Sequence, residues 1–212
     1  MSTNLKKPDA RIDFPATSRN REPILELFKR ILPSYGTILE IASGSGQHIT
    51  YFAKNIDALT WQPSDADPNI LPSIAAWTKS QNLEEKILPP LLIDTRMPNW
   101  HIKDSETLSA IIIINLVHIA PWNVITSLFK QAENLLKSDS LLYFYGPYKI
   151  NNLHTSTSNE KFDQALKCQN IEWGVRNLDD LITLATFHNF RLMETVPMPA
   201  NNRSVIFKKN IS

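Results

Sequence analysis

Two glycines and an acid stand close together in the segment Thr37–His48, which reads TILEIASGSGQH. Gly44 and Gly46 are two of only five glycines in the chain. Glycine has no Cβ, so it lets a ligand approach the backbone, and it tolerates positive φ angles. Glu40 precedes Gly44 within the apolar run and could face positive charge on a ligand. These residue types in this order are typical of a nucleotide-type site between a strand and a helix.

The dinucleotide fingerprint G-x-G-x-x-G is incomplete here, because Ile49 stands at its third position. The pattern E-x-x-x-G-x-G is similar to the first motif of class I S-adenosylmethionine (SAM) methyltransferases. A SAM site holds a sulfonium, an amino acid end and a ribose but no phosphate, so a nearby acid is compatible with it. We therefore favour SAM, with a dinucleotide site or an unoccupied tight turn as alternatives. Ala42 stands where many methyltransferases carry a first glycine, and His48 follows the second glycine of this chain.

Carboxylates follow the next two predicted strands. Asp65 ends the second strand, where an acid can accept hydrogen bonds from both ribose hydroxyls. Asp67 competes for that role, but we assign it to the cap of a helix that starts near Asn69. Asp94 and Thr95 end the third strand, where a polar side chain and an amide could meet an adenine edge. The alternative for Asp94 is that it starts a turn.

Polar residues also stand at the ends of the two most apolar predicted strands. Asn115 and His118 follow the run of isoleucines, and Tyr145 and Tyr148 end the next strand. We predict that Asn115 contacts the cofactor and that His118 is a general base for a hydroxyl or protonated amine. The tyrosines would be polar or cation–π walls for a sulfonium, with Tyr148 near the reacting groups. A lone histidine in this position is as often a packed structural residue.

Arg19 and Asn20 precede an apolar helical face that we expect to begin at Pro23. Spacing alone favours a solvated entry to that helix over a segment that folds onto the ligand. On the other side of the crevice, the polar insertion 149–159 is a candidate substrate lid. Further substrate-side candidates, for which turn structure is the alternative, are Trp122, Tyr145, Asn159, Trp173, Arg176, Asn201 and Asn202.

Strands alternate with helices through most of the chain, and the last two strands form a hairpin. This order predicts an α/β fold with a Rossmann-like, doubly wound, seven-stranded sheet and a C-terminal antiparallel hairpin, the class I methyltransferase fold. The predicted strands are Thr37–Ile41, Ala58–Gln62, Leu91–Asp94, Ala110–Ile119, Leu141–Gly146, Phe190–Val196 and Ser204–Lys208.

The composition is that of one globular domain. The 212 residues carry a net charge of +1, so neither nucleic acid nor a membrane is an expected partner. Cys168 is the single cysteine, which excludes an internal disulfide, and we expect no metal site and a cytoplasmic location. We expect a flexible tail over residues 1–12 and one domain over 13–212. Nothing in the sequence specifies an oligomeric state.

Several longer segments together resemble a family of class I SAM-dependent methyltransferases, the methyltransferase-like twenty-six type, formerly a domain of unknown function. The similarity covers roughly residues 13–208. The segments are Arg19–Ile24, Leu39–His48, Trp61–Asp65, Asn115–Trp122, Tyr145–Tyr148, Thr155–Asn159, Trp173–Arg176 and Met198–Asn202.

This resemblance implies the fold and the cofactor, S-adenosyl-L-methionine. It also favours a role for Arg19 and Asn20 at the methionine carboxylate or the substrate, because both lie in a family segment. The predicted function is methyl transfer to a small molecule. The alternatives are a SAM-binding sensor or scaffold without turnover and an NAD-dependent oxidoreductase, against which Ile49 argues.

Overall fold

The computed structural model describes residues 9–103 and 105–211. Its seven-stranded sheet has the order β3-β2-β1-β4-β5-β9-β8. The strands are β1 (Thr37–Ile41), β2 (Thr60–Asp65), β3 (Leu91–Leu92), β4 (Leu108–Ile114), β5 (Leu141–Pro147), β8 (Phe190–Met198) and β9 (Asn202–Lys209). The helices are α1 (Pro15–Ile31), α2 (Gln47–Asn55), α3 (Leu71–Ser80), α4 (Trp122–Leu135), α5 (Thr157–Gln169) and α6 (Leu178–Phe187), with short 3-10 turns η1 (Ser105–Thr107) and η2 (Pro199–Asn201).

The five strands from β1 to β5 run parallel. The chain adds β2 and β3 on one side of β1 and then β4 and β5 on its other side, so the strand order reverses at β1. β9 pairs antiparallel with both β5 and β8. The predicted seven-stranded sheet and its terminal antiparallel hairpin are therefore confirmed. In such a sheet, ligands bind beyond the carboxyl ends of the strands, at the point where strand order reverses.

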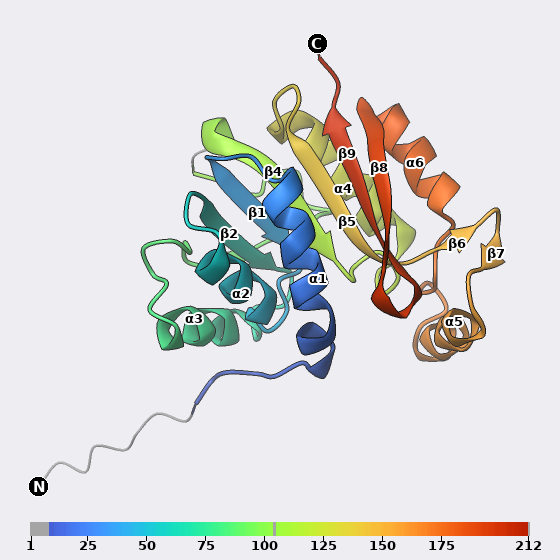
Figure 1. The fold of residues 1–212 in the computed structure, drawn as a ribbon, viewed down its shortest axis with the longest axis horizontal. Coiled ribbons are helices and arrows are strands. Elements are labelled where there is room, and N and C mark those ends of the chain that lie inside the picture. Colours follow the sequence, from blue (N-terminus) through green and yellow to red (C-terminus); the bar gives the residue numbers. More distant parts are fainter. Residues whose placement is uncertain (1–8, 104, 212) are drawn as a thin grey trace, which may run out of the picture.

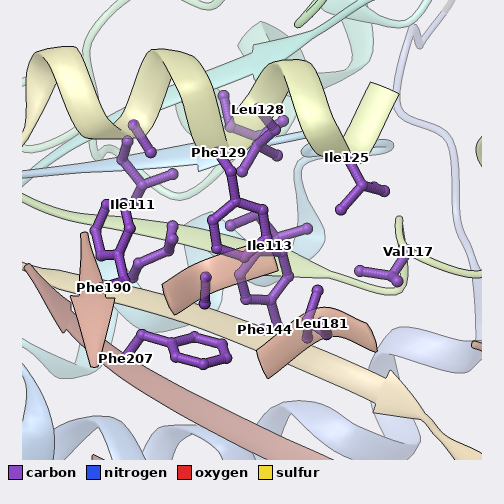
Figure 2. Close-up of a cluster of buried hydrophobic side chains, with 14 of the residues drawn as sticks. Ile111, Ile113, Val117, Ile125, Leu128, Phe129, Phe144, Leu181, Phe190 and Phe207 are labelled. Carbon is purple, nitrogen blue, oxygen red and sulfur yellow. The ribbon is translucent and has the colours of Figure 1, made fainter. Parts of the chain in front are cut away.

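Helices cover both faces of the sheet (Figure 1). On β4, Ile111 and Ile113 point to the face covered by α4 and α6, where Phe129 and Phe144 also pack (Figure 2). Ile112 belongs to the opposite cluster, which α1 and α2 cover. Successive strand residues alternate between faces, so a strand buried on both sides needs apolar residues at every position. This requirement explains the isoleucine run and fixes β4 at the centre.

Two elements differ from the sequence-based expectations. The first helix begins at Pro15 and runs through Pro23, eight residues earlier than predicted. The polar insertion after β5, the predicted substrate lid, contains regular structure that the sequence did not indicate: a small hairpin of β6 (Lys149–Ile150) and β7 (Leu153–His154), followed by α5. Figure 1 shows this hairpin and α5 beside the sheet, at the end where β5 finishes.

The predicted N-terminal tail lies partly outside the described residues, which begin at residue 9. Within the described part, two hydrogen bonds join Ile12 to α3. Ile12 N donates to Ser73 Oγ (2.9 Å), and Ile12 O accepts from Trp77 Nε1 (2.8 Å). Arg11 lies over the Trp77 ring at 5.2 Å. None of the helices in the described ranges is long and apolar enough to cross a membrane.

Candidate functional site

The loop Ala42–Gly46, here called the glycine loop, leaves β1 at the carboxyl end of the sheet. Its backbone takes positive φ at Ala42 (57°), Gly44 (56°) and Gly46 (90°). A Cβ on Gly46 would lie 2.7 Å from the Ile74 Cα, so this position excludes a side chain. Ala42 adopts a left-handed conformation that costs an alanine about 1 kcal/mol or more. The loop is therefore a close-packed bend, in which the N–H groups of Ser43, Gly44 and Gly46 donate to protein acceptors.

Asp65 ends β2 directly beside this loop, as predicted from the sequence. Its Oδ2 accepts from Gly44 N (2.9 Å), and its Oδ1 accepts from Asp67 N (3.0 Å). Asp67 accepts from Asn69 N (2.9 Å), and α3 starts later without a side-chain cap. The prediction that Asp67 caps the helix is therefore wrong, because this carboxylate closes a turn before it.

Glu40 is buried within β1, with 1% of its surface exposed. Its Oε2 has no hydrogen-bond partner in the described part of the chain. Burial raises its pKa to about 8, opposed by a hydrogen bond from Ser43 and reinforced by the charge of Asp65. A buried carboxyl oxygen without a partner is costly, so Oε2 could accept a hydrogen bond from a ligand donor.

The N-terminal segment lies across the glycine loop, which no sequence motif indicated. Phe14 N donates to Gln47 Oε1 (2.7 Å), and Gln47 Nε2 donates to Asp13 Oδ1 (3.1 Å). The Phe14 ring lies 3.3 Å from where a Gly44 Cβ would be. The signal in the sequence was weak, since it consists of one aromatic residue in a polar stretch. This contact brings the start of α1 to the site.

Asn20 links α1 to α2 and β5. Its Oδ1 lies 2.7 Å from His48 Nε2, and it also bonds the hydroxyl of Tyr145. Burial and, second, the charge of Arg21 lower the pKa of His48 to about 3, so this imidazole is neutral at pH 7. His48 Nε2 must then carry the proton that it donates to the amide oxygen.

A cavity of about 510 Å³, here called the strand-end cavity, opens beside these residues at the ends of β4 and β5. Its walls come from α1, the exits of β4 and β5, α5 and the turn between β8 and β9. The lining residues are Ala16, Arg19, Asn20, Asn115, His118, Ile119, Tyr145, Pro147, Ser158, Asn159, Phe162, Pro199, Ala200 and Asn202. The cavity thus gathers seven predicted site residues from distant parts of the sequence: Arg19, Asn20, Asn115, His118, Tyr145, Asn159 and Asn202.

His118 is the titratable base of this cavity. Burial lowers its pKa to about 4, and the charge of Arg176 acts in the same direction. The edge of the Phe162 ring faces the imidazole at 5.3 Å between centroids. Nδ1 is shielded from solvent, close to Gly146, and has no partner among the described residues. Exchange of a proton with the cavity therefore falls to Nε2.

The backbone around His118 is held by the turn after α5. Gly174 N donates to His118 O (2.9 Å), and Arg176 Nη2 donates to Ala120 O (2.8 Å). Asp163 on α5 in turn accepts from Val175 N (2.7 Å). Arg176 therefore acts on the backbone beside His118, and no contact with a substrate follows from its position.

Asp163 is itself surrounded by three basic groups, here called the Asp163 cluster. Lys167 lies 2.8 Å from its carboxylate, and Lys149 and His154 each lie 3.3 Å away. Its side chain is 5% exposed. Gly174, with φ 151°, has no room for a Cβ, which would lie 2.6 Å from Asp163 Oδ1. The Asp163 cluster thus links the β6–β7 hairpin, α5 and the turn after α5, and this turn contacts the backbone of His118.

Five of the predicted catalytic and substrate-side residues lie outside the lining of the strand-end cavity: Trp122, Tyr148, Trp173, Arg176 and Asn201. Tyr148 is buried in the apolar cluster under α4, and its pKa is raised by burial, so its position does not fit the predicted catalytic role. Trp122 stacks on Arg176 at 5.8 Å, and Trp173 closes a turn with Asn170. Asn201 is exposed and accepts through its carbonyl from Asn159 Nδ2 (3.0 Å).

The predicted adenine-edge residues have protein partners. Asp94 pairs with Arg96 (2.6 Å), and the hydrogen bonds from Arg96 lower its pKa. Thr95 is buried and donates to Val124 O at the start of α4 (3.0 Å). Both follow β3 at the carboxyl edge, where the sequence placed them.

Sequence reasoning missed much of the apolar wall. Ala16, Ile119, Phe162 and Pro199 line the strand-end cavity, yet none of them carries a polar group that would mark a site. Phe162 could have been singled out, since it stands on the polar face of a helix that buries little apolar surface.

Residues 11–209 match the family described as "Protein of unknown function (DUF938)". Among solved structures, human N-acetylserotonin methyltransferase in complex with SAM aligns over 92% of this chain and 53% of its own, with a TM-score of 0.76 and 13% identity. An O-methyltransferase family protein from Burkholderia thailandensis aligns over 93% and 58%, with a TM-score of 0.76 and 11% identity.

The mitomycin 7-O-methyltransferase MmcR aligns over 82% of this chain and 49% of its own, with a TM-score of 0.70 and 14% identity. This chain thus spans about half the length of the methyltransferases it resembles. At these identities the likeness shows the fold, a seven-stranded methyltransferase sheet with antiparallel C-terminal strands.

Proposed function

This chain belongs to the DUF938 family, and from that premise, its fold and the geometry of its site we propose that it transfers methyl groups from SAM to a small molecule. The resemblance of its segments to the methyltransferase-like twenty-six type supports the same activity. The single observation that carries the proposal is the buried, unpartnered carboxyl of Glu40 beside the glycine loop.

The residues present fit SAM. Glu40 Oε2 is an acceptor without a protein donor, and the amino acid end of SAM carries an ammonium. Asp65 stands at the strand end where ribose hydroxyls can be bonded. Arg19 and Asn20 stand at the mouth of the strand-end cavity and can bond the methionine carboxylate. Glu40, Asp65, Arg19 and Asn20 therefore offer partners for the ammonium, the ribose and the carboxylate of the cofactor.

Bound SAM supplies a methyl group that a sulfonium sulfur activates for displacement. The protein contributes alignment of the acceptor, which lies in the strand-end cavity between Tyr145 and His118. Neutral His118 can take a proton from the acceptor at Nε2. Phe162 and Ile119 give the cavity an apolar surface beside the imidazole.

Calorimetric titration of SAM at pH 7, in two buffers with different ionisation enthalpies, tests this assignment. We expect binding in about the micromolar range, typical of metabolite sites. With a pKa of about 8, Glu40 is mostly protonated in the free protein, and an adjacent ammonium favours its ionised form. Binding should therefore release close to one proton per SAM.

The variant Glu40→Gln should bind SAM more weakly and release no proton. Glu85→Gln, at an exposed carboxylate, is the matched control and should behave as the unchanged protein. Failure of both SAM and S-adenosylhomocysteine to bind at millimolar concentration would contradict the proposal.

A SAM-binding sensor remains the second candidate, and the strand-end cavity favours the enzyme over it. A sensor requires only the cofactor side, whereas this cavity of about 510 Å³ adjoins a titratable base. The two functions differ in the release of S-adenosylhomocysteine when acceptors are supplied.

A further inference from the structure

The wall of the strand-end cavity opposite the glycine loop is apolar and accessible. Ile119 and Phe162 are 41% and 40% exposed, and both line this cavity. Pro199 and Ala200 continue the same wall from the β8–β9 turn. Exposed apolar groups that gather in a concave site are typical of a binding surface for an apolar ligand.

The charge in the cavity is of one sign. None of the described residues that line it is an aspartate or a glutamate, and Arg19 is the lining residue with a permanent charge. The nearby carboxylate of Asp163 is turned toward Lys149 and Lys167. A bound sulfonium adds a second positive charge. In the free protein an ammonium group would meet the charge of Arg19, and with SAM bound it would meet the sulfonium. In neither state does a described lining residue supply an acidic counter-ion, so binding of an ammonium group is disfavoured.

The hydrogen-bonding groups are suited to a hydroxyl. Besides His118, the polar lining consists mainly of the amides of Asn20, Asn115, Asn159 and Asn202. Asn20 and Asn159 are already engaged with His48 and with Thr155. His118 and the amide oxygens of Asn115 and Asn202 therefore remain as acceptors for a ligand O–H, and His118 is the one of these groups that can also take up its proton.

We propose, on the basis of the function proposed above, that the acceptor is a hydroxyl group on a flat, apolar ring system that is uncharged or anionic, and not an amine. Its ring lies against Phe162 and Ile119, and its oxygen faces His118. The positive charge of the strand-end cavity disfavours an amine acceptor, which is protonated at pH 7. The apolar wall of the cavity disfavours saturated polar molecules.

In the reaction, the acceptor oxygen attacks the methyl carbon of the sulfonium. The new C–O bond forms as the C–S bond breaks, and the sulfur keeps the electron pair of that bond in S-adenosylhomocysteine. The hydroxyl becomes strongly acidic as it is alkylated, so its proton passes to Nε2 of His118 and then to water. A weak base suffices, because the proton leaves an oxygen that is becoming an oxonium.

Three probes with one ring system test the proposal by binding, without SAM present: 2-naphthol, naphthalene and 2-(aminomethyl)naphthalene, which is protonated at pH 7. Titration followed by NMR of the His118 ring gives each affinity. We expect 2-naphthol to bind best, naphthalene more weakly, and the ammonium probe about tenfold or more weaker than 2-naphthol. Equal or tighter binding of the ammonium probe would overturn the proposal.

Two variants locate the binding. Phe162→Ala should weaken 2-naphthol about tenfold, while Phe187→Ala, an exposed phenylalanine outside the cavity, should leave it unchanged. His118→Ala should abolish the preference for 2-naphthol over naphthalene. Equal effects of Phe162→Ala and Phe187→Ala would contradict the assigned wall.

A turnover assay with SAM separates this inference from the proposed function. Release of S-adenosylhomocysteine with 2-naphthol and not with the amine supports both. Release with the amine alone would overturn the acceptor class and leave the methyltransferase activity intact. Absence of SAM binding would instead contradict the proposed function, whereas the binding results without SAM would still test the cavity.

Discussion

The glycine loop takes its shape from its own few residues and one neighbour, whereas His118 is held by three segments from distant parts of the chain. Ala42, Gly44 and Gly46 set the path of the loop by their φ angles, and Asp65 fixes it through Gly44 N. The cavity around His118 instead collects walls from residue 16 to residue 202. One side of the site is thus encoded locally and the other by packing.

Because of this difference, the glycine loop and the surroundings of His118 should respond differently to substitutions. A loop built on positive φ angles fails at single positions, because no neighbour can relieve a misplaced Cβ. The His118 side depends on a chain of contacts that runs from Asp163 through Val175 and Gly174 to the His118 carbonyl. Damage there should loosen the cavity and spare the loop. Three substitutions test that contrast.

The largest effect is expected for Gly46→Ala. The new Cβ would lie 2.7 Å from the Ile74 Cα, at a φ of 90°. Backbone strain and overpacking should together cost about 4 kcal/mol in the free energy of unfolding. Chemical denaturation gives that cost, and calorimetry should find no SAM binding at concentrations that saturate the unchanged protein.

Ala42→Gly is the matched control in the same loop. Glycine relieves the left-handed strain at φ 57° but adds entropy to the unfolded chain, so stability should change by less than about 1 kcal/mol. A large loss at Ala42, or a small one at Gly46, would contradict local encoding of the loop.

The same contrast explains which predictions from the sequence succeeded. Glycine spacing and an acid at a strand end report local geometry, so Glu40, Gly44, Gly46 and Asp65 could be placed together. The isoleucine run placed β4 at the centre of the sheet, because burial on both faces requires an apolar residue at every position.

The sequence was less informative about the other side. Tyr148 looked like a site residue because it follows a strand end, but its side chain turns into the apolar core. Phe162 and Pro199 carry no chemical signal, and only packing of α5 and the β8–β9 turn brings them to His118. Such positions depend on contacts between distant segments, which local patterns do not report.

A smaller effect, confined to the acceptor side, is expected for Asp163→Ala. The substitution leaves three basic groups without an acid and Val175 N without its acceptor, at a cost of about 3 kcal/mol in stability. Hydrogen exchange at residues 174–176 should accelerate, and 2-naphthol should bind more weakly. SAM affinity should stay within about threefold of the unchanged protein, since no loop contact is lost.

Two controls accompany this substitution. Asp163→Asn keeps an oxygen for Val175 N and removes the charge, so its effect should be intermediate. Asp57→Ala breaks an exposed pair with Lys86 and should change neither stability nor binding measurably. Equal losses of SAM and 2-naphthol affinity in Asp163→Ala would show that the two sides are not independent.

The two sides also differ in the groups that burial keeps uncharged. Burial raises the pKa of the acid Glu40 to about 8 and lowers the pKa of the base His118 to about 4. Glu40 therefore contributes a loss of stability as pH rises from about 4.5 to 8, because its carboxyl retains in the folded state a proton that the unfolded state releases. His118 contributes the opposite slope, since its stabilising term is lost as pH falls from about 6.5 to 4.

The smallest expected effect isolates the acid. In Glu40→Gln the slope due to the carboxyl disappears, so the free energy of unfolding of the variant relative to the unchanged protein should rise by about 2 kcal/mol between pH 6 and pH 8. Histidine terms are common to both proteins and cancel in this difference. Denaturation midpoints at both pH values give the measurement. Parallel pH profiles would mean that Glu40 already ionises normally in the free protein, and the unpartnered carboxyl would then no longer distinguish the cofactor side from the acceptor side.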